Sequence, residues 1–419
     1  MKMFILILVS YFLFSCEKID PPSNPTPISV DDSTFLVKWS TKLGFNHSFA
    51  SSYENFLYKN ELIVGAKDLD SVASSRLIGF DKFTGKKLWE YEFTTERGGW
   101  RGFTNIVQKE NMLIISTLTA LFAFDLNTRS ILWSKVHDDT GEDGSSYMNI
   151  EGNYVYTWLS IGFYSGIGFQ NKLVRFNIHT GQRGNVYQYT HPKGWSVGYS
   201  QPAQYIDPIS NDTILLFKRY YSSPIEGPKM PSDLCAYNLS KKELIWEKIA
   251  FSPLSSSEFY PSNIVGDDAL VVSDNSVYKY DIMTGELLWK RTLGANPNTW
   301  LGYFLIAEPT LYNDQLFLQE NGKGFYCISA INGNVIWTNP NGSSSPGQNM
   351  IINKDMIINN CGGCGRIRGY DLHTGLTFMS KKAPNGNAIS TGTAYDVETD
   401  TYYTRDFYSA FAFKVNKPK

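Results

Sequence analysis

The chain has 419 residues, and its 38 basic side chains nearly balance its 40 acidic ones, which gives a formal net charge of −2. This balance argues against a general binder of polyanions such as nucleic acid, because such proteins usually carry a basic face. Hydrophobic residues make up 42% of the chain and charged residues 19%, so the sequence can build a large core and is not intrinsically disordered. The 15% of aromatic residues and the 34 glycines favour strands and tight turns over helices.

The N-terminus has the pattern of a bacterial secretory signal. Lys2 precedes the apolar run Met3–Phe14, which at about a dozen residues is too short to span a bilayer of roughly 30 Å. The residues Leu13–Cys16 resemble a lipobox, in which a cysteine receives a lipid and becomes the new N-terminus. We expect residues 1–15 to be a lipoprotein signal peptide and Cys16 to be the lipidation site. The alternative is an ordinary signal peptide followed by an unrelated cysteine.

Residues 16–33 contain four prolines together with several Ser and Asp residues. Such a composition cannot build a core and suits a flexible tether. No later stretch is long and apolar enough to span a membrane. The expected location is therefore the bacterial cell envelope, with the chain lipid-anchored in the outer membrane and the side of that membrane left open.

One unit of strand, turn and strand recurs through residues 34–419, which we expect to form a single domain. Its clearest copies, Leu77–Trp89 and Val277–Trp289, share the pattern Asp-x-x-Thr-Gly-x-x-x-Trp, in which the acidic side chain caps a turn and Gly takes a positive φ. The other copies are Leu121–Trp133, Leu173–Asn185, Leu234–Trp246, Phe325–Trp337 and Ile367–Met379. The copies recur at about 48 residues, a spacing typical of four-stranded propeller blades.

The two ends of the chain complement each other. Phe35–Leu43 matches only the outer strand of a unit, whereas Gly392–Val397, Thr401–Arg405 and Tyr408–Val415 match the inner strands that lack an outer one. Joining the two ends closes a ring without a free edge. The sequence thus predicts an all-β fold, a single eight-bladed β-propeller of four-stranded antiparallel blades, closed by the N-terminal outer strand pairing with the C-terminal strands.

Six units carry a tryptophan near the end of their last strand, and we expect each ring to pack on the neighbouring blade. Burial of such a ring contributes a few kcal/mol. The six residues are Trp39, Trp89, Trp133, Trp246, Trp289 and Trp337.

The turn motif of Asp81–Trp89 and Asp281–Trp289 resembles the quinoprotein, or PQQ-like, β-propeller repeat, and the resemblance covers Phe35–Val415. Two branches of that family matter here. Quinoprotein dehydrogenases bind pyrroloquinoline quinone (PQQ) and Ca²⁺ on the channel axis, whereas a non-catalytic branch includes the lipid-anchored propeller of the outer-membrane β-barrel assembly machinery. This chain is shorter than most of the dehydrogenases and lacks their adjacent Cys-Cys pair. The resemblance therefore implies the architecture and transfers no binding residues.

The cysteines offer one candidate bond. Cys235 and Cys327 occupy equivalent strands of different blades, and we expect them to be small buried residues. Cys361 and Cys364 flank two glycines at a turn between strands, which predicts a disulfide in an oxidising compartment. A redox motif or half of a zinc site are the alternatives, but no helix follows and no second pair lies nearby.

No arrangement of residues points to catalysis. The five histidines are dispersed, and the acidic stretch Asp138–Gly144 misses the register of a Ca²⁺ loop because Ile150 stands where the closing Glu belongs. We expect His179 and His373, which lie inside repeat turns, to be exposed. The sequence predicts no catalytic residue, metal site or cofactor, and PQQ with Ca²⁺ stays a minor alternative.

Aromatic residues gather in the segments that would form one rim of the ring. Insertions at Leu159–Asn171 and Arg219–Asp233 enter blades 3 and 4, which are neighbours. Exposed aromatic side chains on adjacent loops indicate a binding patch. The candidate residues are Trp100, Phe163, Tyr164, Phe169, Trp195, Tyr220, Tyr221 and Trp300. The alternative is that the three tryptophans fill the mouth of the central channel.

The function expected from the sequence is that of a non-catalytic envelope lipoprotein whose rim binds a protein or other ligand. The alternatives are a glycan-binding or carbohydrate-active propeller and a PQQ-dependent oxidoreductase. The expected partners are an envelope protein or a glycan, with membrane contact only through the lipid and with no nucleic acid.

Overall fold

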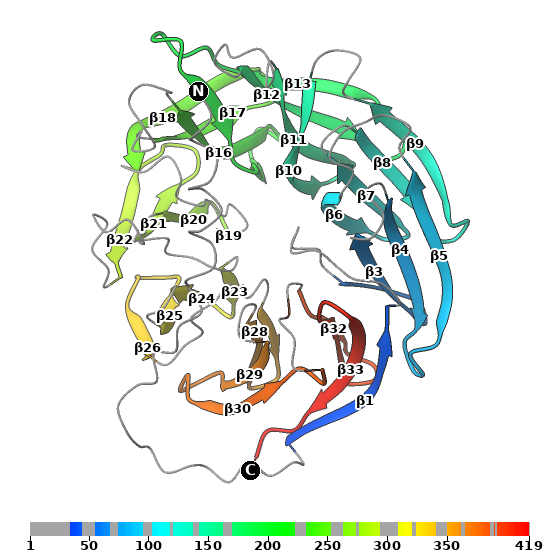
Figure 1. Ribbon diagram of the computed structural model, residues 1–419. Helices are drawn as coiled ribbons and strands as arrows, with labels where there is room; N and C mark the ends of the chain where they lie inside the picture. Colours follow the sequence, from blue (N-terminus) through cyan, green and yellow to red (C-terminus); the bar gives the residue numbers. More distant parts are fainter. Residues whose placement is uncertain are drawn as a thin grey trace, which may run out of the picture.

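The described strands lie in a ring of blades around a central axis (Figure 1). The structure is a computed structural model that describes residues 34–43, 55–67, 74–94, 103–117, 120–136, 142–161, 170–222, 232–252, 263–273, 276–293, 309–320, 324–340, 350–361, 365–385, 389 and 392–418. These residues form 33 strands and no α-helix. Within the same residues, no helix is long and apolar enough to cross a membrane.

Blades 1 to 3 each contain four consecutive antiparallel strands, ordered from the axis outward. Blade 1 consists of β2 (Asn55–Tyr58), β3 (Glu61–Lys67), β4 (Ser74–Asp81) and β5 (Lys87–Thr94). Blade 2 consists of β6 (Phe103–Lys109), β7 (Met112–Thr117), β8 (Ala120–Asp125) and β9 (Ser130–Val136). Blade 3 consists of β10 (Glu142–Glu151), β11 (Tyr154–Ile161), β12 (Gln170–Asn177) and β13 (Arg183–Gln188).

Blade 4 has five strands because a short extra strand, β14, precedes its first regular one. It consists of β14 (Ser196–Tyr199), β15 (Ala203–Ile206), β16 (Thr213–Ser222), β17 (Ser232–Asn238) and β18 (Glu243–Ser252). Blade 5 consists of β19 (Asn263–Val265), β20 (Asp268–Ser273), β21 (Ser276–Asp281) and β22 (Leu287–Thr292).

The remaining blades complete the eightfold ring. Blade 6 consists of β23 (Thr310–Tyr312), β24 (Gln315–Glu320), β25 (Gly324–Ser329) and β26 (Val335–Asn339). Blade 7 consists of β27 (Met350–Asn353), β28 (Met356–Cys361), β29 (Arg366–Asp371) and β30 (Thr377–Lys382). Blade 8 joins β31 (Ala394–Asp396), β32 (Thr401–Arg405) and β33 (Ser409–Val415) to β1 (Phe35–Lys42) from the other end of the chain.

The ring closes as the sequence predicted. β1 pairs antiparallel with β33, with Phe35 opposite Val415 and Lys42 opposite Ser409. The closing interface between blades 8 and 1 also contains a buried ion pair, in which Lys82 Nζ lies 2.9 Å from Asp396 Oδ2. The eight-bladed architecture and its closure are thereby confirmed.

The repeat turns have the expected caps. In blade 1 the Asp81 carboxylate accepts hydrogen bonds from the backbone N–H and the hydroxyl of Thr84, both at 2.8 Å, and Gly85 has a φ of 71°. His179 and His373 lie exposed in two of these turns, as expected.

Five of the six repeat tryptophans pack on the turn of the next blade. Each indole N–H donates to a backbone carbonyl of that turn, for example from Trp39 to Lys82 at 3.0 Å and from Trp133 to Ile178 at 2.8 Å. A Cβ on the turn glycine would lie 2.3–2.7 Å from the ring, so only glycine permits the contact. The five pairs are Trp39–Gly85, Trp133–Gly181, Trp246–Gly285, Trp289–Gly333 and Trp337–Gly375.

Trp89 is the exception, because the turn of blade 2 has Arg129 where the turns contacted by the other five tryptophans have glycine. A side chain there excludes the usual contact, and Trp89 instead covers Gly79 of its own blade and donates to the Glu61 carboxylate. The Arg129 guanidinium lies 5.3 Å from the centroid of the Trp89 ring and pairs with Glu61 at 2.9 Å. Trp89 still packs on the neighbouring blade, as expected, since its ring also stacks on Phe124 of β8 with centroids 6.3 Å apart.

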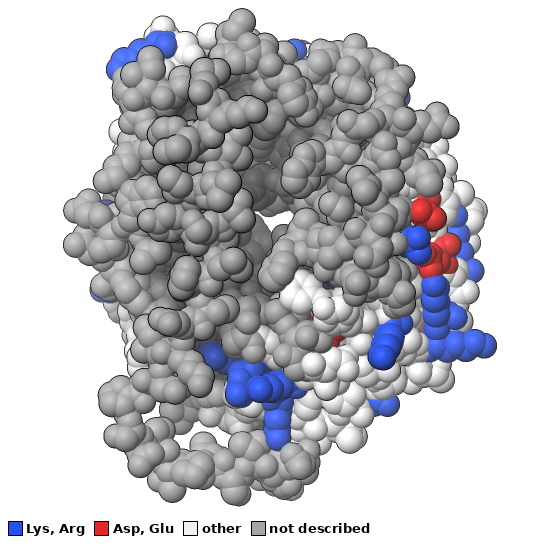
Figure 2. All heavy atoms as spheres, in the orientation of Figure 1, with Lys and Arg blue, Asp and Glu red and all other residues white. Residues whose placement is uncertain are grey.

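The two rims of the ring differ. One rim, here called the turn rim, carries the described turns between the first and second and between the third and fourth strands of the blades. On the opposite side, the loop rim, lie the strand ends that flank every internal segment outside the described residues. Figure 2 shows one face of the ring, where charged side chains of described residues gather at the outer edge over β4 and β5 and near β30.

Candidate binding surface at blades 3 and 4

The interface between blades 3 and 4 lacks the usual tryptophan–glycine contact. Asn185 stands in the tryptophan position of blade 3, and Lys242, with a φ of 59°, stands in the glycine position of blade 4. Both halves of the contact are missing together, which shows that this interface is held in another way.

The extra strand β14 links the two blades at their loop rim. It pairs antiparallel with the last residues of β16, Arg219–Ser222, and Val197 forms one parallel bridge with Gln170 of β12. Blades 3 and 4 thereby become a single nine-stranded sheet, whereas each other blade is a separate four-stranded sheet. Gly198 in β14 permits this pairing, because a Cβ there would lie 2.0 Å from the Tyr220 ring.

The two insertions are shorter than the sequence suggested, because their ends belong to strands. Leu159–Ile161 continue β11 and Asn171 lies in β12, so residues 162–169 form the connection. In blade 4, Arg219–Ser222 complete β16 and Asp233 lies in β17. The ten-residue strands β16 and β18 extend this part of the ring toward the loop rim, where the connection 223–231 joins β16 to β17 and the connection 162–169 joins β11 to β12.

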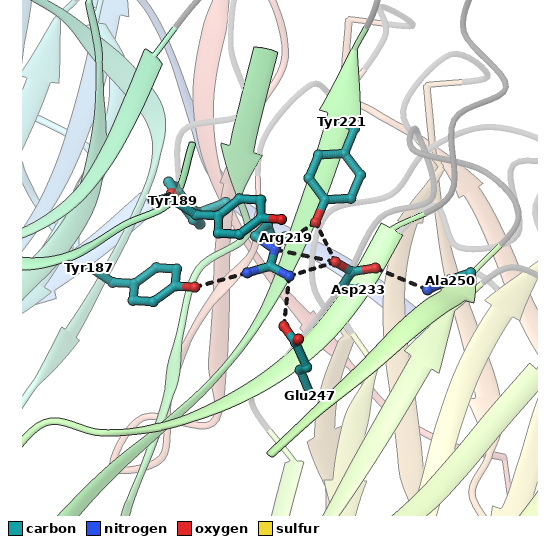
Figure 3. A network of polar contacts seen from close by, with 8 residues as sticks. Tyr187, Tyr189, Arg219, Tyr221, Asp233, Glu247 and Ala250 are labelled. Atoms are coloured by element: carbon teal, nitrogen blue, oxygen red, sulfur yellow. Dashed lines mark hydrogen bonds and ion pairs between the residues drawn. The ribbon is translucent and has the colours of Figure 1, made fainter. Parts of the chain in front are cut away.

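Arg219 is the centre of a buried polar network at this place (Figure 3). Only 2% of this residue is exposed, and its guanidinium donates to Asp233 Oδ2 at 2.7 Å, to Glu247 Oε2 at 2.7 Å and to the Tyr187 hydroxyl at 2.8 Å. The Tyr189 ring lies 3.7 Å from the guanidinium carbon. A buried cation is tolerated only when its hydrogen bonds are satisfied in this way. The network joins the end of β13 to β16, β17 and β18.

Tyr221 also belongs to this network and contacts both Arg219 and Asp233. Its hydroxyl accepts a 2.7 Å hydrogen bond from Arg219 Nε and donates to Asp233 Oδ2. Burial and the hydrogen bond to the Asp233 carboxylate raise the pKa of Tyr221, and burial raises the pKa of Tyr187 to about 12 despite the neighbouring Arg219. Both phenols therefore stay protonated at neutral pH and act as hydrogen-bonding groups.

The surface of this region carries a stacked pair of rings. His191 and Trp195 lie parallel, with centroids 4.3 Å apart and an interplanar angle of 4°. Lys193 Nζ lies 4.5 Å from the Trp195 centroid, and the His191 ring also contacts Tyr221 at 4.7 Å. Both stacked residues are half-buried, so the pair connects the buried network to solvent.

The structure describes three of the eight aromatic residues proposed for the rim. Trp195 and Tyr220 are half-buried, whereas Tyr221 is buried with 4% exposed, so the expectation that Tyr221 is an exposed rim residue is wrong. Its hydroxyl is needed inside the sheet by Asp233 and Arg219. Trp100, Phe163, Tyr164, Phe169 and Trp300 lie outside the described residues, as do the lipidation site Cys16 and the tether.

Sequence reasoning missed Arg219, Asp233 and Glu247, and assigned the first two to the ends of an insertion. The signal that would have found them is the run Thr213–Ser222, in which four apolar residues, Lys218, Arg219 and two tyrosines follow one another without a turn residue. A strand of that length carries its charged residue into the sheet, where it needs partners.

The other chemical predictions concern cysteines and metals. Cys235 and Cys327 are buried free thiols, as expected, and burial raises the pKa of each to about 12. The predicted Cys361–Cys364 bond falls outside the described side chains. Among the residues that the structure describes, no group of three His, Cys, Asp or Glu side chains is placed to hold a metal ion. Most of the acidic stretch Asp138–Gly144 also lies outside the residues that the structure describes.

The fold defines the chain as an eight-bladed β-propeller, and comparison with known proteins gives the type of its repeat. Residues 227–400 match the PQQ_2 family, described as outer membrane protein assembly factor BamB. No curated protein sequence matches the chain. This match assigns the repeats to the PQQ-like β-propeller type.

Solved structures with the same fold have very different origins. BamB from Moraxella catarrhalis is 12% identical, with a TM-score of 0.58 over 91% of this chain and 99% of its own. A europium-containing methanol dehydrogenase is 12% identical, with a TM-score of 0.63 over 94% of this chain and 96% of its own. The computationally designed protein Ika8 is also 12% identical, with a TM-score of 0.61 over 88% of this chain and 98% of its own. At this identity the likeness shows the fold alone.

Proposed function

We propose that this chain is a non-catalytic propeller scaffold, lipid-anchored in the bacterial cell envelope, that binds a protein partner at the loop rim of blades 3 and 4. The observation that carries the proposal is β14, which joins these two blades into one sheet where the usual interblade contact is absent. The family assignment supports a propeller scaffold, and the sequence pattern at Cys16 supports the anchor.

A reinforced junction suits a binding platform. Functional segments of repeat folds are usually connections held on a rigid frame, because the frame fixes where the connections leave. Here the buried Arg219 network fixes the ends of β16 and β17, from which the connection 223–231 leaves, while β14 abuts the end of β12 beside the connection 162–169. Both connections are thus supported by the same nine-stranded sheet.

The place where the N-terminal strand begins favours an accessible surface. β1 starts at Phe35 opposite Val415, at the turn rim, and runs toward the loop rim. The tether at residues 16–33 therefore joins the ring on the side opposite the proposed surface. A lipid at Cys16 would hold the turn rim nearer to the membrane and leave blades 3 and 4 open to a partner.

The test replaces residues 162–169 with a Gly-Ser linker of equal length in the full-length, membrane-anchored protein. Chemical cross-linking on intact cells with mass-spectrometric identification first defines the partner of the unchanged protein, and its affinity is then measured with purified components. We expect the replacement to weaken binding by about tenfold or more, because most binding energy comes from a few residues. The thermal unfolding midpoint should stay near that of the unchanged protein.

A matched control replaces residues 341–349, a connection of similar length between blades 6 and 7, with the same type of linker. This variant should keep full affinity. An unchanged partner set and affinity in the 162–169 variant would count against the proposal, as would equal losses in both variants.

A glycan ligand is the second candidate, favoured by the half-buried ring of Trp195 beside Lys193. Aromatic rings commonly stack on sugars, but one neighbour of the Trp195 ring is already His191 at 4.3 Å. A glycan array comparing the unchanged protein with Trp195→Ala distinguishes the two candidates, because only a glycan-binding surface would lose signal there.

A further inference from the structure

One residue of blade 4 has an unusual backbone conformation. Ten non-glycine residues among those described have a positive φ, and nine of them lie in connections between strands. The tenth is Ala250, with a φ of 52°, inside the outermost strand β18. Alanine rarely adopts this conformation, since its Cβ crowds the backbone and no side-chain polar group compensates.

Ala250 lies in a bulge that the other blades do not have. Ser232 is opposite Ser252 and Leu234 is opposite Lys248, so residues 249–251 of β18 face Asp233 alone. The pair formed by the third and outermost strands has one register shift in every blade, but among the described strands only blade 4 has a second shift in this pair, at the other end of its outermost strand.

The bulge is held by the buried network. Asp233 Oδ1 accepts a 2.9 Å hydrogen bond from the backbone N–H of Ala250, while Asp233 Oδ2 binds Arg219 (Figure 3). Asp233 is itself buried, with 3% exposed. A strained conformation persists only when its surroundings over-determine it, and such positions cluster at functional sites.

The effect of the bulge is to hold Ile249 out in solvent. This side chain is 73% exposed, which is the highest value for a large apolar residue within any described strand. Bulges commonly re-aim a side chain in this way. An isoleucine left in solvent contributes little burial free energy, so the stability of the fold does not explain its exposure.

We propose that Ile249 is an anchor residue that enters an apolar pocket on the protein partner. The inference rests on the proposed function and extends it to the outer edge of blade 4. The aliphatic side chain of Ile249 favours an apolar pocket, and the neighbouring Glu247 is already paired with Arg219 at 2.7 Å. A partner needs no cation opposite Glu247, and the buried network holds Ile249 in position before binding.

The experiment places a photo-cross-linking amino acid at position 249 of the full-length protein in intact cells, with position 132 as the matched control. Leu132 is also an exposed apolar residue of an outermost strand, 47% exposed on β9, but it lies in the register shift near the repeat turn, which the other blades share. We expect position 249 to give a cross-link to one envelope protein that position 132 does not give.

The affinity between the propeller and that purified protein is then measured. Ile249→Asp should weaken binding by about tenfold or more with an unchanged unfolding midpoint, whereas Leu132→Asp should change neither. Ala250→Gly relieves the backbone strain, and glycine can still adopt the conformation of the bulge. This variant should therefore bind as the unchanged protein does.

Three results would overturn the proposal: the same cross-links at both positions, a cross-link only to a second copy of this chain, or full affinity in Ile249→Asp. If the 162–169 replacement abolishes binding while Ile249→Asp does not, only this inference fails. If neither variant affects binding, the proposed surface at blades 3 and 4 fails with it.

Discussion

The indole nitrogen of Trp337 donates a 3.0 Å hydrogen bond to the backbone carbonyl of Leu372, which lies in the turn of the next blade. Gly375 of the same turn lies so close to the ring that a Cβ there would be 2.3 Å from Trp337 Cε3. One contact thus imposes two requirements on one glycine, a positive φ and the absence of a side chain.

Gly375→Ala should therefore be strongly destabilising. The φ of 70° strains alanine, and the Cβ also displaces the Trp337 ring, so we expect the free energy of unfolding to fall by about 2–4 kcal/mol. Gly152→Ala is the matched control, because its φ is 58° and no atom lies within 4 Å of the added Cβ. It should lose only about 1 kcal/mol in the same chemical denaturation experiment. Equal losses would show that the ring contact adds nothing.

Removal of the closing ion pair should open the ring more easily. In Asp396→Asn, Lys82 keeps its charge while its side chain is only 7% exposed, so we expect a loss of about 3 kcal/mol in the free energy of unfolding. Lys354→Met removes the exposed partner of Asp400 and should change stability by about 0.5 kcal/mol or less. Urea denaturation compares the two variants, and similar small effects would argue that the closing pair does not hold the ring.

The same pair predicts a dependence on pH. Burial alone would raise the pKa of Asp396, but hydrogen bonds from Lys82 and Thr399 outweigh burial and leave the pKa below its ordinary value of 3.8. A carboxyl whose pKa is lowered by folding stabilises the native state above that value and loses this contribution as the pH falls through the folded pKa. The stability difference between the unchanged protein and Asp396→Asn should shrink below about pH 4. A difference that stays constant between neutral and acidic pH would contradict this explanation.

Arg219→Met should be among the most damaging single substitutions. The change removes the cation and leaves Asp233 buried without its guanidinium partner, for an expected loss of about 3–5 kcal/mol in unfolding free energy. Arg219→Lys should retain only part of this unfolding free energy, because an ammonium group cannot reproduce hydrogen bonds in several directions within one plane. Thermal and chemical unfolding measure both variants, and full rescue by lysine would show that charge alone matters.

The two buried thiols should be unreactive in the native protein. Burial raises the pKa of Cys235 and of Cys327 to about 12, so almost no thiolate is present at neutral pH. In a variant with Cys361 and Cys364 changed to Ser, a thiol reagent such as Ellman's reagent should label neither residue until the protein is unfolded. Rapid labelling of the folded variant would mean that this part of the ring opens readily.

The architecture was predictable because each blade repeats the same local chemistry. A turn such as Asp81–Gly85 needs a capping carboxylate and a left-handed glycine, and these requirements are visible in the residues themselves. The closure was predictable too, since Phe35–Leu43 and Tyr408–Val415 supply complementary parts of one unit. The bounds of β1 and β33 agree with these segments to within one residue.

The candidate surface was less predictable because it is the place where the repeat is interrupted. Nothing in Ser196–Tyr199 shows that these residues pair with two different blades, since the pairing depends on where β12 and β16 end in space. Arg219 followed by two tyrosines has the composition of a solvated loop, and only the sheet around it supplies Asp233 and Glu247 as partners. Buried ion networks of this kind depend on contacts between distant segments, which a local pattern does not contain.

The pairing of β1 with β33 also has a kinetic consequence. Of the strands in the ring, the first to leave the ribosome is hydrogen-bonded to the last, so its partner does not exist until the rest of the propeller has been synthesised. Joining segments so far apart carries a large loop-closure entropy, and folds dominated by such distant pairings mature slowly. The nascent propeller is thus an open arc with an unsatisfied strand at its leading end, and it needs protection from aggregation until translation is complete.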